Sequence, residues 1–239
     1  MLCVLDTGIQ TAAENMSCDA MLLKELRNDP ILHLYSWEGF CASYGHFIRP
    51  EKHLDLESAR RVKLSLAKRP TGGGIVFHIW DYAFSFLMPS SHPRFSQNPL
   101  ENYRFVNEVV LEVMQDFLSP NERVELIPDS FPVLGEDCQN FCMARPTQYD
   151  VVYKGFKIAG AAQRKTKLGY LHQGTISLAS PDEEFLRGVL LSKADVVAAM
   201  RAYTFAPLGV GCEVERLDEV RREIGRQLER AFQRYLPNL

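Results

Sequence analysis

The chain has 239 residues, of which 46% are hydrophobic and 24% are charged, and its formal net charge is −3. This composition is typical of a globular protein with a substantial core, and the small, dispersed charge gives no argument for a nucleic-acid or membrane-surface partner. No basic leader precedes an apolar segment, and no apolar run approaches the roughly 20 residues that cross a bilayer, so we expect a cytoplasmic protein.

The hydrophobic periodicity predicts helices and strands in irregular alternation. In chain order these are a helix over 11–28, a strand over 31–37, a hairpin partner or pocket turn at 41–45, a surface helix over 54–64, strands over 74–79 and 82–88, a loop over 89–99 and a helix over 103–118. After the irregular stretch 119–140 come a hairpin with strands over 151–153 and 156–162, a strand over 171–178, and helices over 183–190, 193–200 and 214–236. Without a regular βαβ alternation, this order predicts an α+β fold, with mixed sheets flanked by helices, in one domain over 1–239.

The six cysteines are scattered without the spacing of a disulfide framework, which suits a reducing compartment. Cys138 and Cys142 are four residues apart, but no second pair of ligands accompanies them. Structural zinc sites need four such ligands. The sequence therefore predicts no metal site.

The most informative stretch is KRPTGGGIVFH, at residues 68–78. Its three glycines can take positive φ, approach a ligand closely, and turn their N–H groups into an anion-binding nest. Lys68 and Arg69 supply matching positive charge, and Pro70 holds Arg69 extended. A triple glycine alone is more often a plain hairpin turn, but the cations and the apolar run after it favour a ligand-binding loop.

A second stretch, GFKIAGAAQR at residues 155–164, forms the return strand of the predicted hairpin. Gly160, Ala161 and Ala162 are small enough for a ligand to lie against the backbone. The strand LHQGTI, at residues 171–176, follows it.

Together these motifs resemble the catalytic domain shared by lipoate protein ligases, octanoyltransferases and biotin protein ligases. KRPTGGGIVFH is similar to the arginine- and glycine-rich loop of the lipoate enzymes, GFKIAGAAQR to the segment with their essential lysine, and LHQGTI to the strand that follows. Two further matches are Asn15-Met16 with Asp19, and Tyr35-Ser36-Trp37 leading to Ser43-Tyr44-Gly45. Biotin ligases have a different glycine-rich loop, so the lipoate branch is favoured.

The resemblance implies acylation of a lysine on a lipoyl domain of 2-oxo acid dehydrogenases or of the glycine cleavage H protein. Lys157 matches the essential lysine and would stabilise negative charge on an acyl carbonyl or adenylate phosphate. The implied substrate or nucleotide contacts are Arg69, Thr71, Gly72, Gly73, Gly74, His78, Gly160, Ala161, Ala162, His172, Gly174 and Thr175. For His78 a structural role is an equal alternative.

The family divides into ligases, which use ATP and Mg²⁺ to make lipoyl-AMP, and octanoyltransferases, which take octanoate from acyl carrier protein. Cys142, in CMARPTQYD, resembles the nucleophile of the cysteine octanoyltransferases, although a buried thiol is also a common packing residue. The uninterrupted Gly72–Gly74 resembles the ligases. On that basis we favour a ligase acting on lipoate or octanoate, with a Cys142-dependent octanoyltransferase as the alternative and a non-catalytic acyl-binding protein as the third hypothesis.

The sequence also departs from the family pattern. Ile79 follows His78 where many relatives have an acidic residue, and Asp81 is the candidate substitute. Ile48 stands where glutamine or asparagine is usual. We expect no C-terminal accessory domain, so a ligase of this kind would need a separate accessory chain as its partner.

Overall fold

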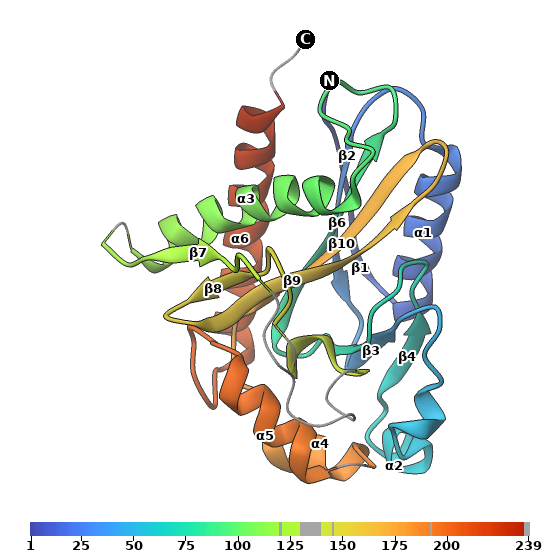
Figure 1. Ribbon diagram of the computed structural model, residues 1–239. Coiled ribbons are helices and arrows are strands. Elements are labelled where there is room, and N and C mark those ends of the chain that lie inside the picture. The colour runs from blue at the N-terminus through green and yellow to red at the C-terminus, as the bar shows by residue number, and fades with distance from the viewer. Residues whose placement is uncertain (120, 130–139, 145, 192, 237–239) are drawn as a thin grey trace.

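Two β-sheets form the framework of the computed structural model, which describes residues 1–119, 121–129, 140–144, 146–191 and 193–236 (Figure 1). The larger sheet has seven strands in the order β1-β2-β6-β10-β9-β8-β7, and the smaller has three in the order β4-β3-β5. Parallel and antiparallel pairs occur in both sheets. The predicted α+β class with mixed sheets is confirmed.

The strands are β1 (Cys3–Gln10), β2 (Ile31–Trp37), β3 (Cys41–Tyr44), β4 (Ser65–Lys68), β5 (Ile75–Phe77), β6 (Asp81–Pro89), β7 (Val124–Leu126), β8 (Val151–Tyr153), β9 (Phe156–Lys165) and β10 (Gly169–Ser177). The helices are α1 (Ala12–Glu25), α2 (Leu56–Arg61), α3 (Pro99–Leu118), α4 (Glu183–Val189), α5 (Lys193–Tyr203) and α6 (Val214–Tyr235). Two short 3₁₀ turns are η1 (Pro50–Lys52) and η3 (Cys142–Ala144).

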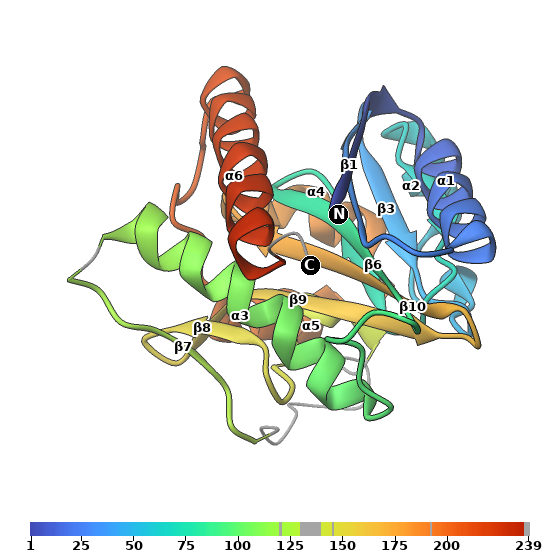
Figure 2. The ribbon, with the colours of Figure 1, turned by 90° about the horizontal axis from the view of Figure 1, so that it is seen from above.

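The centre of the large sheet is the antiparallel pair β6 and β10, which is buried at every position. Side chains alternate between its two faces. Phe84 and Phe86 pack under α3 and α6, where the Phe86 ring stacks on Phe232 at 4.5 Å between centroids. Leu87 and Leu171 pack under α1. The sheet is therefore sandwiched, with α3 and α6 over one face and α1 over the other (Figure 2).

Local signals explain where two of the helices begin. Thr11 caps α1, and its hydroxyl and backbone N–H exchange hydrogen bonds with Glu14 in a complete capping box. Asn98 caps α3, with Pro99 at the first helical position. The loop predicted over 89–99 therefore ends one residue early, and α3 gains its first turn from a cap rather than from apolar spacing.

The structure corrects several predicted elements. Residues 3–10 form β1, where no strand is predicted, and the short strands β4 and β7 are also absent from the prediction. The segment 41–45 is not a hairpin partner of 31–37, because β3 lies in the smaller sheet, parallel to β4 and antiparallel to β5. Its position beside the glycine-rich loop agrees with the alternative prediction of a pocket turn.

Within the described part of the chain, no helix is both long and apolar enough to cross a membrane.

Candidate functional site

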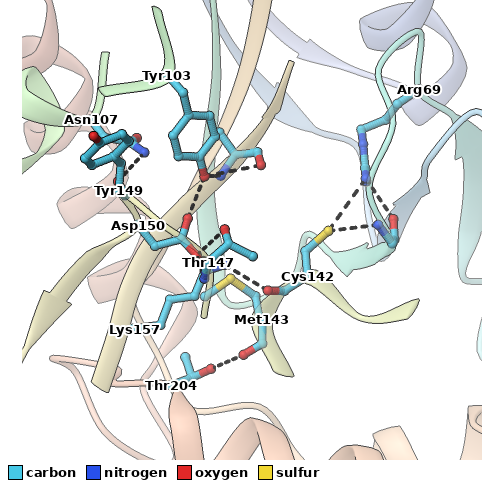
Figure 3. Close-up of polar contacts among 12 residues, drawn as sticks. Arg69, Tyr103, Asn107, Cys142, Met143, Thr147, Tyr149, Asp150, Lys157 and Thr204 are labelled. Carbon is cyan, nitrogen blue, oxygen red and sulfur yellow. Dashed lines mark hydrogen bonds and ion pairs between the residues drawn. The ribbon is translucent and has the colours of Figure 1, made fainter. Parts of the chain in front are cut away.

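The predicted glycine-rich loop and the hairpin strand β9 meet at the 3₁₀ turn η3, which carries Cys142 (Figure 3). The loop joins β4 to β5, and Ile75 forms a β-bridge with Phe141, next to Cys142. Gly73 has φ +83°, and a Cβ there would lie 3.2 Å from both Cys142 Sγ and Arg69 Nη2. Glycine therefore permits both the left-handed turn and the close approach of the loop to the thiol.

Cys142 is half-buried, and its sulfur faces two donors from the loop. The Gly74 N–H donates to Sγ at 3.0 Å, and Arg69 Nη2 lies 3.9 Å from it. The guanidinium of Arg69 therefore turns a full positive charge toward the sulfur, and the Gly74 amide turns the positive end of its dipole toward it. A thiolate is the nucleophilic form of cysteine.

Arg69 is 5% exposed and donates to neutral oxygen acceptors. Nη1 reaches Ser43 O at 3.0 Å and Ser43 Oγ at 2.8 Å, while Nη2 reaches Gly72 O at 3.1 Å and Gly74 O at 2.7 Å. Among the described residues, no carboxylate lies within ion-pair distance of this guanidinium. A buried charge that is not paired is costly, so the site needs an anion beside Arg69.

Lys157 lies on the side of Cys142 away from Arg69 and is 3% exposed (Figure 3). Its Nζ forms a 2.7 Å ion pair with Asp150 Oδ2 and donates to Cys142 O at 2.9 Å. The predicted catalytic lysine therefore holds the backbone of η3 as well as contributing charge. A Cβ at Gly160 would lie 2.5 Å from Lys157 Cε, so glycine there makes room for the lysine side chain.

Asp150 is fully buried and is held by more donors than Lys157 alone. It accepts from the Tyr103 hydroxyl at 2.5 Å and from Thr147 N and Oγ1 at 2.7 and 2.9 Å. Burial first, and the Asp150 charge second, raise the pKa of Tyr103 well above its usual value. The tyrosine is therefore a neutral donor that fixes the carboxylate against Lys157.

The rim of the glycine-rich loop is tied to the core of the large sheet through Thr71. Its hydroxyl donates to Gln173 Oε1 at 2.6 Å, and Gln173 Nε2 donates to Asp19 Oδ2 at 2.5 Å. Asp19 also lies 2.8 Å from His33 Nδ1 and is fully buried. This network fixes the loop to α1, β2 and β10.

His78 is a buried member of the site, held on both ring nitrogens. Nε2 lies 2.6 Å from Ser43 Oγ and Nδ1 lies 2.8 Å from Asp81 Oδ2, while the ring stacks on Trp37 at 4.1 Å between centroids. Thr175 also donates to Asp81 Oδ2. Asp81 therefore contacts His78 directly, and its role as a substitute for an acidic residue at position 79 stays a prediction.

A small cavity opens beside the thiol, lined by Met16, Tyr35, Ser43, Arg69, Val76, His78, Ala83, Cys142, Ala161, Ala162, Gln173, Gly174 and Thr175. The cavity has a volume of about 20 Å³, which is room for about one water molecule. Its walls combine apolar and small side chains with the polar groups at Arg69 and His78. An acyl chain of several carbons needs these walls to move apart.

The structure brings most of the predicted site residues together, but His172 does not line this cavity. It points to the other face of β10, between the rings of Phe84 and Tyr103, and its Nδ1 lies 3.0 Å from the side-chain amide of Gln163. Full burial lowers the pKa of His172 to about 3, so the ring is neutral. Cys138, named in the sequence analysis, lies outside the described residues.

Sequence reasoning missed Asp150, Ser43 and Gln173 as site residues. Asp150 stands in the quoted segment CMARPTQYD, and a carboxylate near an essential lysine is a signal for an ion pair. Ser43 and Gln173 join the site only through contacts between distant parts of the chain. Within the described residues, no cluster of three or more His, Cys, Asp or Glu side chains has the arrangement of a metal site.

Comparisons with known proteins agree on the family. The sequence profile of the lipoyl protein ligase A/B catalytic domain matches residues 11–219. The chain is 30% identical over 176 residues to octanoyltransferase LipM of Staphylococcus aureus, covering 72% of this chain and 64% of that protein. It is 33% identical over 186 residues to octanoyltransferase LipM of Geobacillus kaustophilus, covering 76% and 66%. The match thus spans just under two thirds of these curated relatives.

Solved structures share the fold. A lipoate-protein ligase A bound with ATP has a TM-score of 0.69 at 21% identity, covering 98% of this chain and 84% of its own. A bi-partite lipoate protein ligase from Thermoplasma acidophilum, solved in work on that ligase and its E2 lipoyl domain, has a TM-score of 0.68 at 22% identity, covering 98% and 82%.

Proposed function

Because the chain belongs to the lipoyl protein ligase A/B catalytic domain family, we propose that it is an octanoyltransferase that works through a thioester on Cys142. The acyl donor is octanoyl acyl carrier protein, and the acceptor is the specific lysine of a lipoyl domain. Two features support this choice over an adenylate-forming ligase: the names of the curated relatives and the surroundings of the Cys142 sulfur.

The observation that carries the proposal is the buried Arg69 guanidinium, which has no carboxylate partner among the described residues and turns Nη2 toward Cys142 Sγ. With Cys142 as a thiolate, the charge of Arg69 is balanced and the Gly74 N–H gains an anionic acceptor. A cysteine that served only as a packing residue would have no need of either donor.

The reaction then has two steps. The Cys142 thiolate attacks the thioester carbonyl of the donor, the carbon–sulfur bond to the carrier breaks, and the carrier thiol leaves as a thiolate that takes up a proton. The lysine amine of the lipoyl domain next attacks the Cys142 thioester. The carbon–sulfur bond to Cys142 breaks, an amide forms, and the amine loses its proton to solvent while the thiolate is restored.

The charges of the site act on both steps. Each step passes through a tetrahedral intermediate whose oxyanion develops next to Cys142, within the field of Arg69 and Lys157. Lys157 holds η3 through Cys142 O, so it fixes the backbone that presents the nucleophile. Its charge is opposed by Asp150, so Arg69 contributes the larger net field.

The sequence favoured a ligase because Gly72–Gly74 is uninterrupted. The structural likeness to ATP-bound lipoate-protein ligase A lies at 21% identity, which supports the fold and not the use of ATP. The proposed thioester route needs neither ATP nor Mg²⁺. The expected cytoplasmic location stays a prediction.

The test is to mix the protein with an apo lipoyl domain and either octanoyl acyl carrier protein or octanoate with Mg-ATP, and to follow the domain by intact mass spectrometry. We expect acylation only from the carrier donor, abolished by Cys142→Ser and retained by Cys212→Ser, a matched change at another half-buried thiol. Acylation from octanoate with ATP that survives Cys142→Ser would show a ligase instead. Failure of both donors would favour the acyl-binding hypothesis.

A further inference from the structure

A chain of four buried polar side chains ends at the Cys142 sulfur. Asp81, His78, Ser43 and Arg69 are 6%, 6%, 0% and 5% exposed. The contacts run from Asp81 Oδ2 to His78 Nδ1 at 2.8 Å, from His78 Nε2 to Ser43 Oγ at 2.6 Å, and from Ser43 Oγ to Arg69 Nη1 at 2.8 Å. The second terminal nitrogen, Nη2, donates to Gly74 O at 2.7 Å and to Gly72 O at 3.1 Å, and it lies 3.9 Å from Cys142 Sγ.

The direction of each hydrogen bond follows from the one before it. A carboxylate only accepts, so His78 Nδ1 donates to Asp81, and in a neutral ring Nε2 is then an acceptor. The Ser43 hydroxyl therefore donates to Nε2, which turns its oxygen lone pairs toward Arg69 Nη1. The guanidinium is planar, so fixing Nη1 also fixes where Nη2 points.

The surroundings hold this chain in place. The His78 ring is stacked on Trp37, and Asp81 is held by Thr175. Ser43 is in β3, which pairs with β5, the strand that follows the glycine-rich loop. The network connects the small sheet to the nucleophile, with Asp81 held in it through Oδ2.

We propose that Ser43, His78 and Asp81 are positioning residues that orient the Arg69 guanidinium toward the Cys142 sulfur and so stabilise its thiolate. None of the three contacts the sulfur. They act through Arg69. A buried arginine is ordinarily oriented by a carboxylate, but here the neutral Ser43 hydroxyl does so, and the positive charge of Arg69 remains available to the sulfur.

This inference deepens the proposed function, but its test measures only the reactivity of the Cys142 thiol and needs no acyl transfer. The rate at which iodoacetamide alkylates Cys142 is measured between pH 5 and pH 10, from the mass of the peptide that contains it. The variants are Ser43→Ala, His78→Phe and His78→Gln. The phenylalanine keeps the stacking on Trp37 but no ring nitrogen, while the glutamine side chain keeps an acceptor for Ser43.

We expect Ser43→Ala and His78→Phe to move the alkylation midpoint to higher pH and to lower the rate at pH 6 by about tenfold, the effect of one charge-assisted hydrogen bond. The plateau rate at high pH is not lowered, since a more basic thiolate is at least as nucleophilic. His78→Gln recovers part of the wild-type midpoint.

The control is Asn102→Ala, which removes a buried amide that bonds to the Ser96 backbone at the start of α3. It reports how a general loss of stability changes alkylation, and we expect its midpoint to stay at the wild-type pH. Local unfolding would raise the rate at every pH and leave no shift.

Unchanged profiles in both Ser43→Ala and His78→Phe would overturn the positioning role, as would faster alkylation across the whole pH range. If Cys142→Ser keeps acyl transfer while these midpoints still move, the proposed function fails and the positioning inference stands.

Discussion

The two cations that flank Cys142 differ in how their charge is compensated. Lys157, on β9, is paired with Asp150, which is itself held by Tyr103 and Thr147. Arg69, beside the small sheet, is equally buried but contacts hydroxyl and carbonyl oxygens and the sulfur. Lys157 therefore fixes the backbone that carries the nucleophile, whereas Arg69 supplies the net positive charge that favours an anion at the sulfur.

The largest expected effect is on Arg69. In Arg69→Lys the positive charge is kept, but the planar fork that reaches Ser43 and Cys142 together is lost. We expect the rate of acyl transfer from octanoyl acyl carrier protein to fall about 100-fold, in the range seen when one preorganised donor is removed. The measurement is single-turnover acylation of the lipoyl domain. A rate within a factor of three of wild type would show that the guanidinium of Arg69 is not needed for acyl transfer.

Asp150 should contribute to the stability of the fold, because its negative charge compensates the buried positive charge of Lys157. Asp150→Asn removes the charge that Asp150 places 2.7 Å from the buried ammonium of Lys157, and we expect the free energy of unfolding to fall by about 3–5 kcal/mol. Urea denaturation at pH 7 measures it. The control, Asp218→Asn, breaks a half-exposed pair with Arg221 and should cost less than about 1 kcal/mol. Equal costs for the two variants would contradict the comparison.

A third prediction concerns the space for Lys157. Gly160→Ala places a methyl group 2.5 Å from Lys157 Cε and 2.7 Å from Asp150 Oδ1, so the ion pair has to shift. We expect a loss of about 2 kcal/mol in the free energy of unfolding. At Gly188, in α4, a Cβ meets nothing within 4 Å, and Gly188→Ala should stabilise by about 0.5–1 kcal/mol. The change in the free energy of unfolding, measured by urea denaturation, should therefore have opposite signs in the two variants, and equal signs would contradict the prediction.

The smallest expected effect concerns His172, which contacts neither Arg69 nor Lys157 and contributes to the pH dependence of stability. Its folded-state pKa of about 3 lies below the unfolded value, so the unfolded state binds a proton first and stability falls as pH drops below about 6.5. Between pH 7 and pH 5.5 this one group costs about 1.3 kcal/mol.

We therefore expect His172→Leu to lose less stability than wild type over that interval, by about 1.3 kcal/mol, in urea titrations at both pH values. Identical pH dependences in wild type and His172→Leu would mean that the ring is accessible to protons in the folded state.

Much of the site was predictable because its residues lie in continuous motifs. The glycine-rich loop, Lys157 and Cys142 were named from the sequence, and the structure places them side by side. Asp81 is a candidate because Ile79 stands where many relatives have an acidic residue, and the structure shows that Asp81 contacts His78. The long strands at the centre of the sheet were predicted from their apolar runs.

The rest depends on long-range contacts or weak local patterns. Ser43 meets His78 and Arg69 only because β3 pairs with β5 and β4, and no local pattern reports that pairing. β1 is a partly exposed edge strand with an irregular register around Gly8, so its apolar alternation is poor. His172 belongs to the matching strand motif, but the alternation of side chains along β10 turns it away from the cavity.

The most direct test of the thioester account is the mass of the protein itself after incubation with octanoyl acyl carrier protein, with no ATP and no lipoyl domain present. We predict one octanoyl adduct that maps to Cys142, is removed by neutral hydroxylamine, and is absent in Cys142→Ser. An unmodified protein would contradict the account if the lipoyl domain, added to the same mixture in a parallel reaction, is still acylated.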